Sequence, residues 1–187
     1  MRTIIINLFG GPGSGKSTIA SGLFYTFKSK GLTCDNPYEF PKQVAWEDNT
    51  SQITDQLYVL ANQHRGIVRS YGKVNYIILD LPLLLSLAYK NGYTGDYPAK
   101  FYNDSFDSMV LELFNSYENV NIFLGRPEKK FQQEGRFQTE DESEKYDKII
   151  KQILDNNKIP YHNVKVDENS LRQIIEIIRD EMKNNKK

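Results

Sequence analysis

The chain has 187 residues, and its 24 Lys and Arg residues balance 24 Asp and Glu residues, so the formal net charge is zero. This length suits one domain with a proper hydrophobic core. The balanced charge argues against a protein drawn by its overall field to nucleic acid or to an anionic membrane. The single cysteine, Cys34, excludes an internal disulfide and is typical of a reducing cytosol. No apolar run is long enough to span a bilayer, and we expect no membrane association.

The first thirty residues predict a strand, a glycine-rich loop and a helix. Residues 3–9 are β-branched and apolar, as is typical of a buried strand. Residues 17–30 carry apolar side chains on one helical face. Between them, residues 10–17 read Gly-Gly-Pro-Gly-Ser-Gly-Lys-Ser, a full match to the phosphate-binding pattern G-x-x-x-x-G-K-S/T. A strand before this pattern and a helix after it form the context in which the loop binds nucleotide phosphates.

The residue types in this loop predict ATP and Mg²⁺ as cofactors. The backbone N–H groups of the glycine loop can wrap a triphosphate, and the helix N-terminus adds partial positive charge. We expect Lys16 to reach the β- and γ-phosphates and the Ser17 hydroxyl to ligate Mg²⁺. The expected nucleotide-binding residues are Gly11, Gly13, Ser14, Gly15, Lys16, Ser17 and Thr18.

The rest of the chain alternates predicted strands and helices. Further strands are predicted at 32–35, 74–79, 120–124 and 161–166, the first of them weak. Helices are predicted at about 50–70 and 98–118, after the capping box at 139–142, and from residue 170. The alternation predicts one α/β P-loop domain over residues 1–182, with a five-stranded, mainly parallel sheet and helices on both faces. Residues 183–187 are expected to form a polar tail.

Two carboxylates follow predicted strands, at the sheet edge where ligands of parallel sheets bind. Asp80 comes directly after strand 74–79, and we expect it to contact the metal or a metal-bound water, or to activate the acceptor. The alternative for Asp80 is a plain helix cap. Glu39 lies just beyond strand 32–35 and is expected to act as general base or to bind the acceptor hydroxyl, the alternative being a turn carboxylate. Which of the two is the base stays open.

Residues 126–137 are predicted to form a lid over the phosphates. They follow strand 120–124, and loops between rigid elements often carry function. Arg126 and Arg136 are the expected catalytic cations, because guanidinium groups grip phosphate through two parallel hydrogen bonds. An ordinary charged surface loop is the alternative.

Acceptor contacts are expected from Gln56, Trp46 and Arg65 in addition to Glu39. An amide can read the edge of a heterocycle, and an aromatic ring can stack on it. Core packing or exposed helix surface is the alternative for each. A GTPase is disfavoured, because Asp80 opens Asp-Leu-Pro-Leu rather than D-x-x-G.

On these residues the chain resembles the compact P-loop kinases typified by the ribosylnicotinamide kinase domain of bacterial bifunctional nicotinamide-nucleotide regulators. It also resembles phage proteins classed as AAA-family ATPases. The resemblance runs from Ile4 to about Ile178, and it departs in one place, since Leu81-Pro82 supplies no second carboxylate after Asp80. The matching features are Glu39-Phe40, Gln56, Asp80, Arg126, Gly135-Arg136 and the segment Leu154 to Tyr161. The region of Glu39 and Trp46 is also similar to deoxynucleoside kinases, which implies a glutamate acting on a 5′-hydroxyl.

The leading hypothesis is a kinase that transfers a phosphoryl group from ATP to a hydroxyl or phosphate of a nucleoside- or nucleotide-like small molecule. One alternative is a kinase acting on nucleic acid, at a modified base such as 5-hydroxymethyluracil in DNA or at a 5′ end. The neutral charge counts against nucleic acid, which needs clustered Lys and Arg. Another alternative is a non-kinase ATPase or nucleotide switch. A homodimer is left open, and a cytoplasmic location is expected, in the host cytoplasm if a phage encodes the chain.

Overall fold

In the computed structural model, residues 1–37, 55–90, 102–127 and 140–184 are described, and they contain one five-stranded sheet. The strands are β1 (Ile4–Phe9), β2 (Cys34–Asp35), β3 (Tyr76–Leu79), β4 (Asn119–Gly125) and β5 (His162–Lys165). Their order across the sheet is β2-β3-β1-β4-β5, and every pairing is parallel. The predicted α/β fold with a parallel sheet is therefore confirmed.

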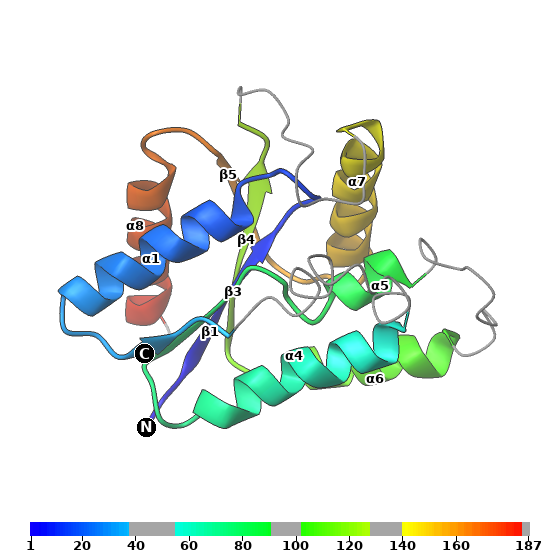
Figure 1. The fold of residues 1–187 in the computed structure, drawn as a ribbon, viewed down its shortest axis with the longest axis horizontal. Coiled ribbons are helices and arrows are strands. Elements are labelled where there is room, and N and C mark those ends of the chain that lie inside the picture. The colour runs from blue at the N-terminus through cyan, green and yellow to red at the C-terminus, as the bar shows by residue number, and fades with distance from the viewer. Residues whose placement is uncertain (38–54, 91–101, 128–139, 185–187) are drawn as a thin grey trace, which may run out of the picture.

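Helices cover both faces of the sheet (Figure 1). The helices are α1 (Lys16–Ser29), α4 (Gln56–Ser70), α5 (Leu85–Tyr89), α6 (Asp104–Asn115), α7 (Glu140–Asn156) and α8 (Ser170–Asn184). Helices α1 and α8 enclose one hydrophobic cluster with the sheet, and α4 to α7 enclose the other. Among these helices, none is both long and apolar enough to cross a membrane.

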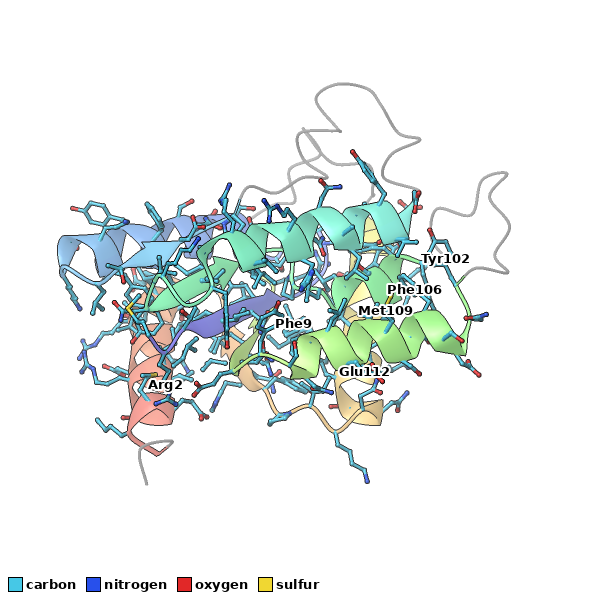
Figure 2. All side chains as sticks on the ribbon, turned by 90° about the horizontal axis from the view of Figure 1, so that it is seen from below. Arg2, Phe9, Tyr102, Phe106, Met109 and Glu112 are labelled. Carbon is cyan, nitrogen blue, oxygen red and sulfur yellow. The ribbon has the colours of Figure 1, made fainter. Side chains whose placement is uncertain are left out.

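Strand β1 is buried on both faces because its side chains alternate between the two clusters. Ile4, Ile6 and Leu8 belong to the cluster under α1 and α8. Ile5 and Phe9 belong to the other cluster, where the ring centroid of Phe9 lies 6.4 Å from that of Phe114 on α6. Phe9 and Phe106, labelled in Figure 2, are buried, whereas Met109 and Glu112 of α6 are exposed. A central strand covered on both faces reads as a continuous apolar run, which explains the sequence of residues 4–9.

One polar residue, Asn7, interrupts that run, and its amide nitrogen donates two hydrogen bonds to β4. The Asn7 amide donates to the side-chain oxygens of Asn119 at 2.9 Å and Asn121 at 3.0 Å. Asn121 in turn donates to the Pro160 carbonyl at 3.0 Å. Buried amides need such partners, so this set of bonds helps to fix the register of β1 against β4.

Two predicted helix starts are wrong, because a capping residue further along the chain sets each start. The Asp55 carboxylate accepts the N–H groups of Leu57 and Tyr58, both at 3.1 Å, so α4 begins at Gln56 rather than near residue 50. The Asn103 side chain accepts the N–H groups of Ser105 and Phe106, so α6 begins at Asp104 rather than near residue 98. Helix α5, at residues 85–89, was not predicted.

Candidate functional site

The phosphate loop lies between β1 and α1, as predicted, and its backbone requires glycine at three positions. Gly10, Gly13 and Gly15 have φ values of 141°, 81° and 91°, which residues with a Cβ rarely adopt. Gly15 is also the N-cap of α1. The first N–H groups of α1 have no acceptor within the helix, so this end of α1 is suited to bind an anion.

The Lys16 ammonium group lies against the loop itself. Its Nζ is 2.7 Å from the Gly10 carbonyl oxygen and 2.9 Å from that of Gly11. Ser17 follows in the first turn of α1 and is half-buried, and Thr18 is exposed. Lys16 and Ser17 therefore supply a cation and a hydroxyl in the first turn of α1, the residue types expected for phosphate and Mg²⁺.

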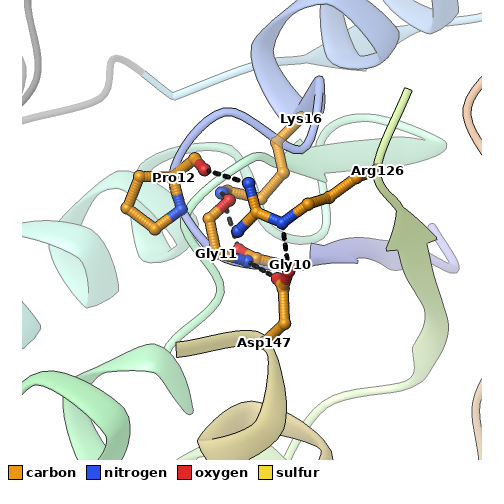
Figure 3. A network of polar contacts seen from close by, with 6 residues as sticks. All are labelled: Gly10, Gly11, Pro12, Lys16, Arg126 and Asp147. Carbon is orange, nitrogen blue, oxygen red and sulfur yellow. Dashed lines mark hydrogen bonds and ion pairs between the residues drawn. The ribbon is translucent and has the colours of Figure 1, made fainter. Parts of the chain in front are cut away.

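Arg126, directly after β4, reaches the same loop (Figure 3). Its Nη1 donates to the Pro12 carbonyl at 3.2 Å, and its Nε donates to the Asp147 carboxylate of α7 at 2.6 Å. The other oxygen of Asp147 accepts the Gly11 N–H at 2.5 Å. The structure thus brings Lys16 and Arg126, two of the predicted catalytic residues, to one loop.

Sequence reasoning missed Asp147, although a signal for it existed. Asp147 precedes Ile150 by three residues and Leu154 by seven, which places it on the inward stripe of α7. Its side chain is 19% exposed and that of Arg126 is 22% exposed. A carboxylate on a buried helical stripe needs a cationic or N–H partner, and that requirement points to a polar site.

Three buried polar atoms at or next to this site lack a hydrogen-bond partner within the described part of the chain. They are Ser14 Oγ in the loop, Arg126 Nη2 and Ser143 Oγ in the first turns of α7. Buried polar atoms are normally paired, and unpaired ones ask for an explanation such as an absent ligand. The oxygens of a bound phosphate are acceptors of the kind that these donors require.

Asp80 stands at the same edge of the sheet. In the β1–β3 pairing Leu79 is opposite Asn7, so Asp80 comes beside the end of β1, where the phosphate loop begins. Asp80 is 6% exposed, and its carboxylate has no hydrogen bond or ion pair with residues in the described ranges. A buried carboxylate and the Ser17 hydroxyl are hard oxygen ligands, which fit Mg²⁺ completed by phosphate oxygens and water. Within the described ranges no group of three or more His, Cys, Asp or Glu side chains could hold a metal without such help.

The predicted acceptor residues are only partly placed. Gln56 is 2% exposed in the first turn of α4, and its backbone N–H donates to the Tyr102 hydroxyl at 2.8 Å. Arg65 is exposed nine residues further along α4, a rise of about 13 Å, so the structure does not bring these two together. Glu39, Trp46 and Arg136 lie outside the described residues, as does most of the predicted lid.

Solved structures share this fold over nearly the whole chain. Thymidylate kinase from Ehrlichia chaffeensis matches with a TM-score of 0.61 and 14% identity, covering 96% of this chain and 99% of that chain. Deoxyadenosine kinase from M. mycoides with bound dATP matches with a TM-score of 0.60 and 21% identity, with the same coverage. Shikimate kinase from Acinetobacter baumannii in complex with shikimate matches with a TM-score of 0.57 and 11% identity, covering 100% and 95%. At these identities the likeness shows the fold alone.

Among curated proteins, none matches the chain. A family model described as an AAA domain matches residues 5–170, which include the phosphate loop, Asp80, Arg126 and Asp147. The match runs from Ile5 of β1 to the first residue of α8 and includes all of the sheet but Ile4. By its sequence, the chain belongs to this family of AAA domains.

Proposed function

We propose that the chain is a kinase that transfers the γ-phosphoryl group of ATP to a hydroxyl or phosphate of a nucleoside- or nucleotide-like small molecule. The observation that carries the proposal is the convergence of Lys16 and Arg126 on one phosphate loop, with the buried Asp80 at the same sheet edge. Two cations at a phosphate site can stabilise charge on a transferring phosphoryl group. A protein that binds a nucleotide without transferring its phosphoryl group does not have to stabilise this developing charge, so a second cation favours a kinase.

Each residue has a distinct proposed role. Lys16 and Arg126 neutralise the phosphates, and the N–H groups at the start of α1 hold them in place. Ser17 and Asp80 would hold Mg²⁺, which, when bound, neutralises phosphate charge. Glu39 would orient the acceptor hydroxyl and take its proton. Arg136 would act from a lid at about 126–137, which completes the kinase domain of residues 1–182.

The proposed acceptor class follows from chemistry and from the relatives. Thymidylate kinase and deoxyadenosine kinase share the fold, and their names refer to a nucleotide and a nucleoside. Gln56 is a buried polar side chain suited to the edge of a base, with Trp46 as a stacking partner in the proposal. Shikimate kinase has the same fold with a non-nucleoside acceptor, so the panel of test acceptors must be broad.

Two alternatives are kept for the test. A kinase acting on nucleic acid is disfavoured by the zero net charge. A nucleotide switch without an acceptor is disfavoured by the second cation at the loop. We also propose a cytoplasmic location, because Cys34 is buried as a free thiol and fits a reducing compartment.

An acceptor screen tests the proposal. ADP release from Mg-ATP is measured with deoxynucleosides, nucleotides, ribosylnicotinamide, shikimate and DNA containing modified bases. An acceptor-dependent rise in ADP release with a nucleoside or nucleotide, absent in the Lys16→Ala variant, is expected. A rise with DNA alone would identify the nucleic-acid kinase, and a constant rate with every acceptor would identify an ATPase or switch.

A further inference from the structure

One carboxylate on α7 joins two parts of the candidate site. Asp147 accepts the Gly11 N–H through Oδ1 at 2.5 Å and the Arg126 Nε–H through Oδ2 at 2.6 Å (Figure 3). We propose that Asp147 is a positioning residue for phosphoryl transfer, which holds the phosphate loop and Arg126 in one arrangement so that the guanidinium group meets the γ-phosphate. The inference rests on the proposed kinase function for the role of Arg126.

The bond to Gly11 leaves the phosphate-binding donors of the loop available. The N–H groups of Ser17 and Thr18 belong to the first turn of α1, where no intrahelical acceptor exists. Gly11 lies at the opposite end of the loop, five residues before Lys16. A nucleotide can therefore bind at the helix N-terminus while Asp147 keeps its hold on Gly11. The Arg126 charge also offsets that of Asp147, which limits repulsion between the carboxylate and the phosphates.

The backbone of Gly11 lies so close to α7 that there is no room for a side chain at this position. Its φ is outside the positive range occupied by Gly10, Gly13 and Gly15, so the backbone does not require glycine there. A Cβ at Gly11 would collide with the Ser143 carbonyl oxygen of α7, and it would lie 2.9 Å from Asp147 Oδ1. The phosphate-binding pattern leaves this position open to any residue. The glycine therefore permits contact with α7, in addition to any role in phosphate binding.

Helix α7 is fixed firmly enough to position a carboxylate. Ile150 and Leu154 are buried in the cluster beneath it, at 2% and 0% exposed. The Tyr146 ring packs on Tyr89 of α5, with centroids 4.6 Å apart, and burial raises the pKa of the Tyr146 hydroxyl. Groups carried on packed helices are held more accurately than groups on loops. Asp147 accepts the Nε–H of Arg126 and Pro12 accepts one N–H of Nη1, whereas Nη2 has no partner within the described ranges and is a donor for a phosphate oxygen.

The first test separates positioning from a structural role. Asp147→Asn keeps the side-chain size and removes the charge, and we expect kcat to fall at least about thirtyfold, with the thermal midpoint within a few degrees of wild type. Asp147→Glu restores the carboxylate and is expected to recover part of kcat. Glu144→Gln is the matched control, because it removes the same charge from the exposed side of the same helix. It is expected to behave as wild type.

The double variant Asp147→Asn/Arg126→Ala tests whether Asp147 acts through Arg126. If it does, the double variant is no slower than Arg126→Ala alone, because the two losses are not independent. Rate losses that multiply would overturn the proposal. A wild-type kcat in Asp147→Asn would also overturn the proposal. So would a loss of rate in Asp147→Asn that equals its loss of folded protein, if Asp147→Glu recovers no activity.

A binding measurement tests the inference without turnover. By calorimetry, wild type is expected to bind Mg-ATP about three- to fivefold more tightly than Mg-ADP, since one more charge-assisted contact forms with the γ-phosphate. Asp147→Asn should lose this preference, and Glu144→Gln should keep it. A preference retained by folded Asp147→Asn, or absent from wild type, would overturn the proposal. If no acceptor is phosphorylated but Asp147→Asn abolishes the preference, the kinase assignment fails while the positioning role stands.

Discussion

Arg126 and Asp147 are 21 residues apart in the chain, yet Arg126 Nε lies 2.6 Å from Asp147 Oδ2. The pair ties the end of β4 to α7, and both partners also bond the phosphate loop, at Pro12 and Gly11. The end of β4 and helix α7 therefore meet at one loop through two charged side chains. This contact places a cation at the loop whose glycines and helix N-terminus are suited to phosphate.

Lys16→Ala should abolish phosphoryl transfer without unfolding the chain. The ammonium group lies against the loop carbonyls of Gly10 and Gly11, and Lys16 belongs to neither hydrophobic cluster. Loss of a charge-assisted contact to the transferring group should lower kcat by roughly 10²-fold or more. Steady-state rates and thermal midpoints are compared with Lys30→Ala, an exposed cation at the other end of α1. Near-wild-type turnover in Lys16→Ala would refute the assignment of the loop.

Asp80→Asn should impair transfer in a manner that depends on the metal. The carboxylate is buried at the sheet edge beside the loop, and the amide is a poorer ligand for a hard cation. We expect kcat to fall by about 10-fold or more and to recover in part at high Mg²⁺ or with Mn²⁺. The measurement is the activity of the variant across metal concentrations. A loss that no metal relieves would assign Asp80 to the acceptor instead.

Mg-ATP should raise the thermal midpoint of the protein, and EDTA should remove most of the gain. Ligand that binds the native state alone stabilises it by about 2.7 kcal/mol when its concentration is 100 times Kd. Without Mg²⁺ the phosphates lose a neutralising partner, and the described cations at the loop, Lys16 and Arg126, remain. Thermal melts with ATP and GTP, each with Mg²⁺ or EDTA, measure the effect. Equal shifts for both nucleotides with no sensitivity to EDTA would point to a different nucleotide-binding protein.

Cys34 should resist alkylation until the chain unfolds. The side chain is 4% exposed, and burial raises the pKa of the thiol, so little thiolate forms at neutral pH. The reactive form should increase only as the pH rises through this raised pKa. Iodoacetamide labelling at pH 7 and pH 9, in buffer and in urea, provides the comparison. Fast labelling of the folded protein at pH 7 would show that β2 opens readily or that the thiol is accessible.

The local motifs allowed much of the fold to be predicted. The strand, phosphate loop and first helix follow from residues 3–30 alone, because apolar period, glycine spacing and helical face agree there. The parallel sheet follows from the alternation of strands and helices, which the register of β1 with β3 and β4 confirms. Lys16, Asp80 and Arg126 were named because each follows a strand or lies in the motif itself.

Features set by tertiary contacts were harder to predict. Helix α5 is buried almost throughout, so its run of Leu and Ala has no amphipathic period. The start of α6 depends on Asn103 as a cap, which the nearby Pro98 obscured as a signal. The position of Asp147 on the inward stripe of α7 indicates a buried carboxylate but does not name its partners. Its place at the phosphate loop depends on a hydrogen bond from the Gly11 N–H, 136 residues away, which the sequence does not reveal.

The fate of the labelled γ-phosphoryl group tests the kinase assignment most directly. Wild type and Lys16→Ala are incubated with γ-labelled Mg-ATP and each acceptor that raises ADP release, and the products are separated. We expect most of the label in a phosphorylated nucleoside or nucleotide, little in inorganic phosphate, and neither with Lys16→Ala. Label found in inorganic phosphate alone, at a rate that no acceptor changes, would contradict the kinase assignment.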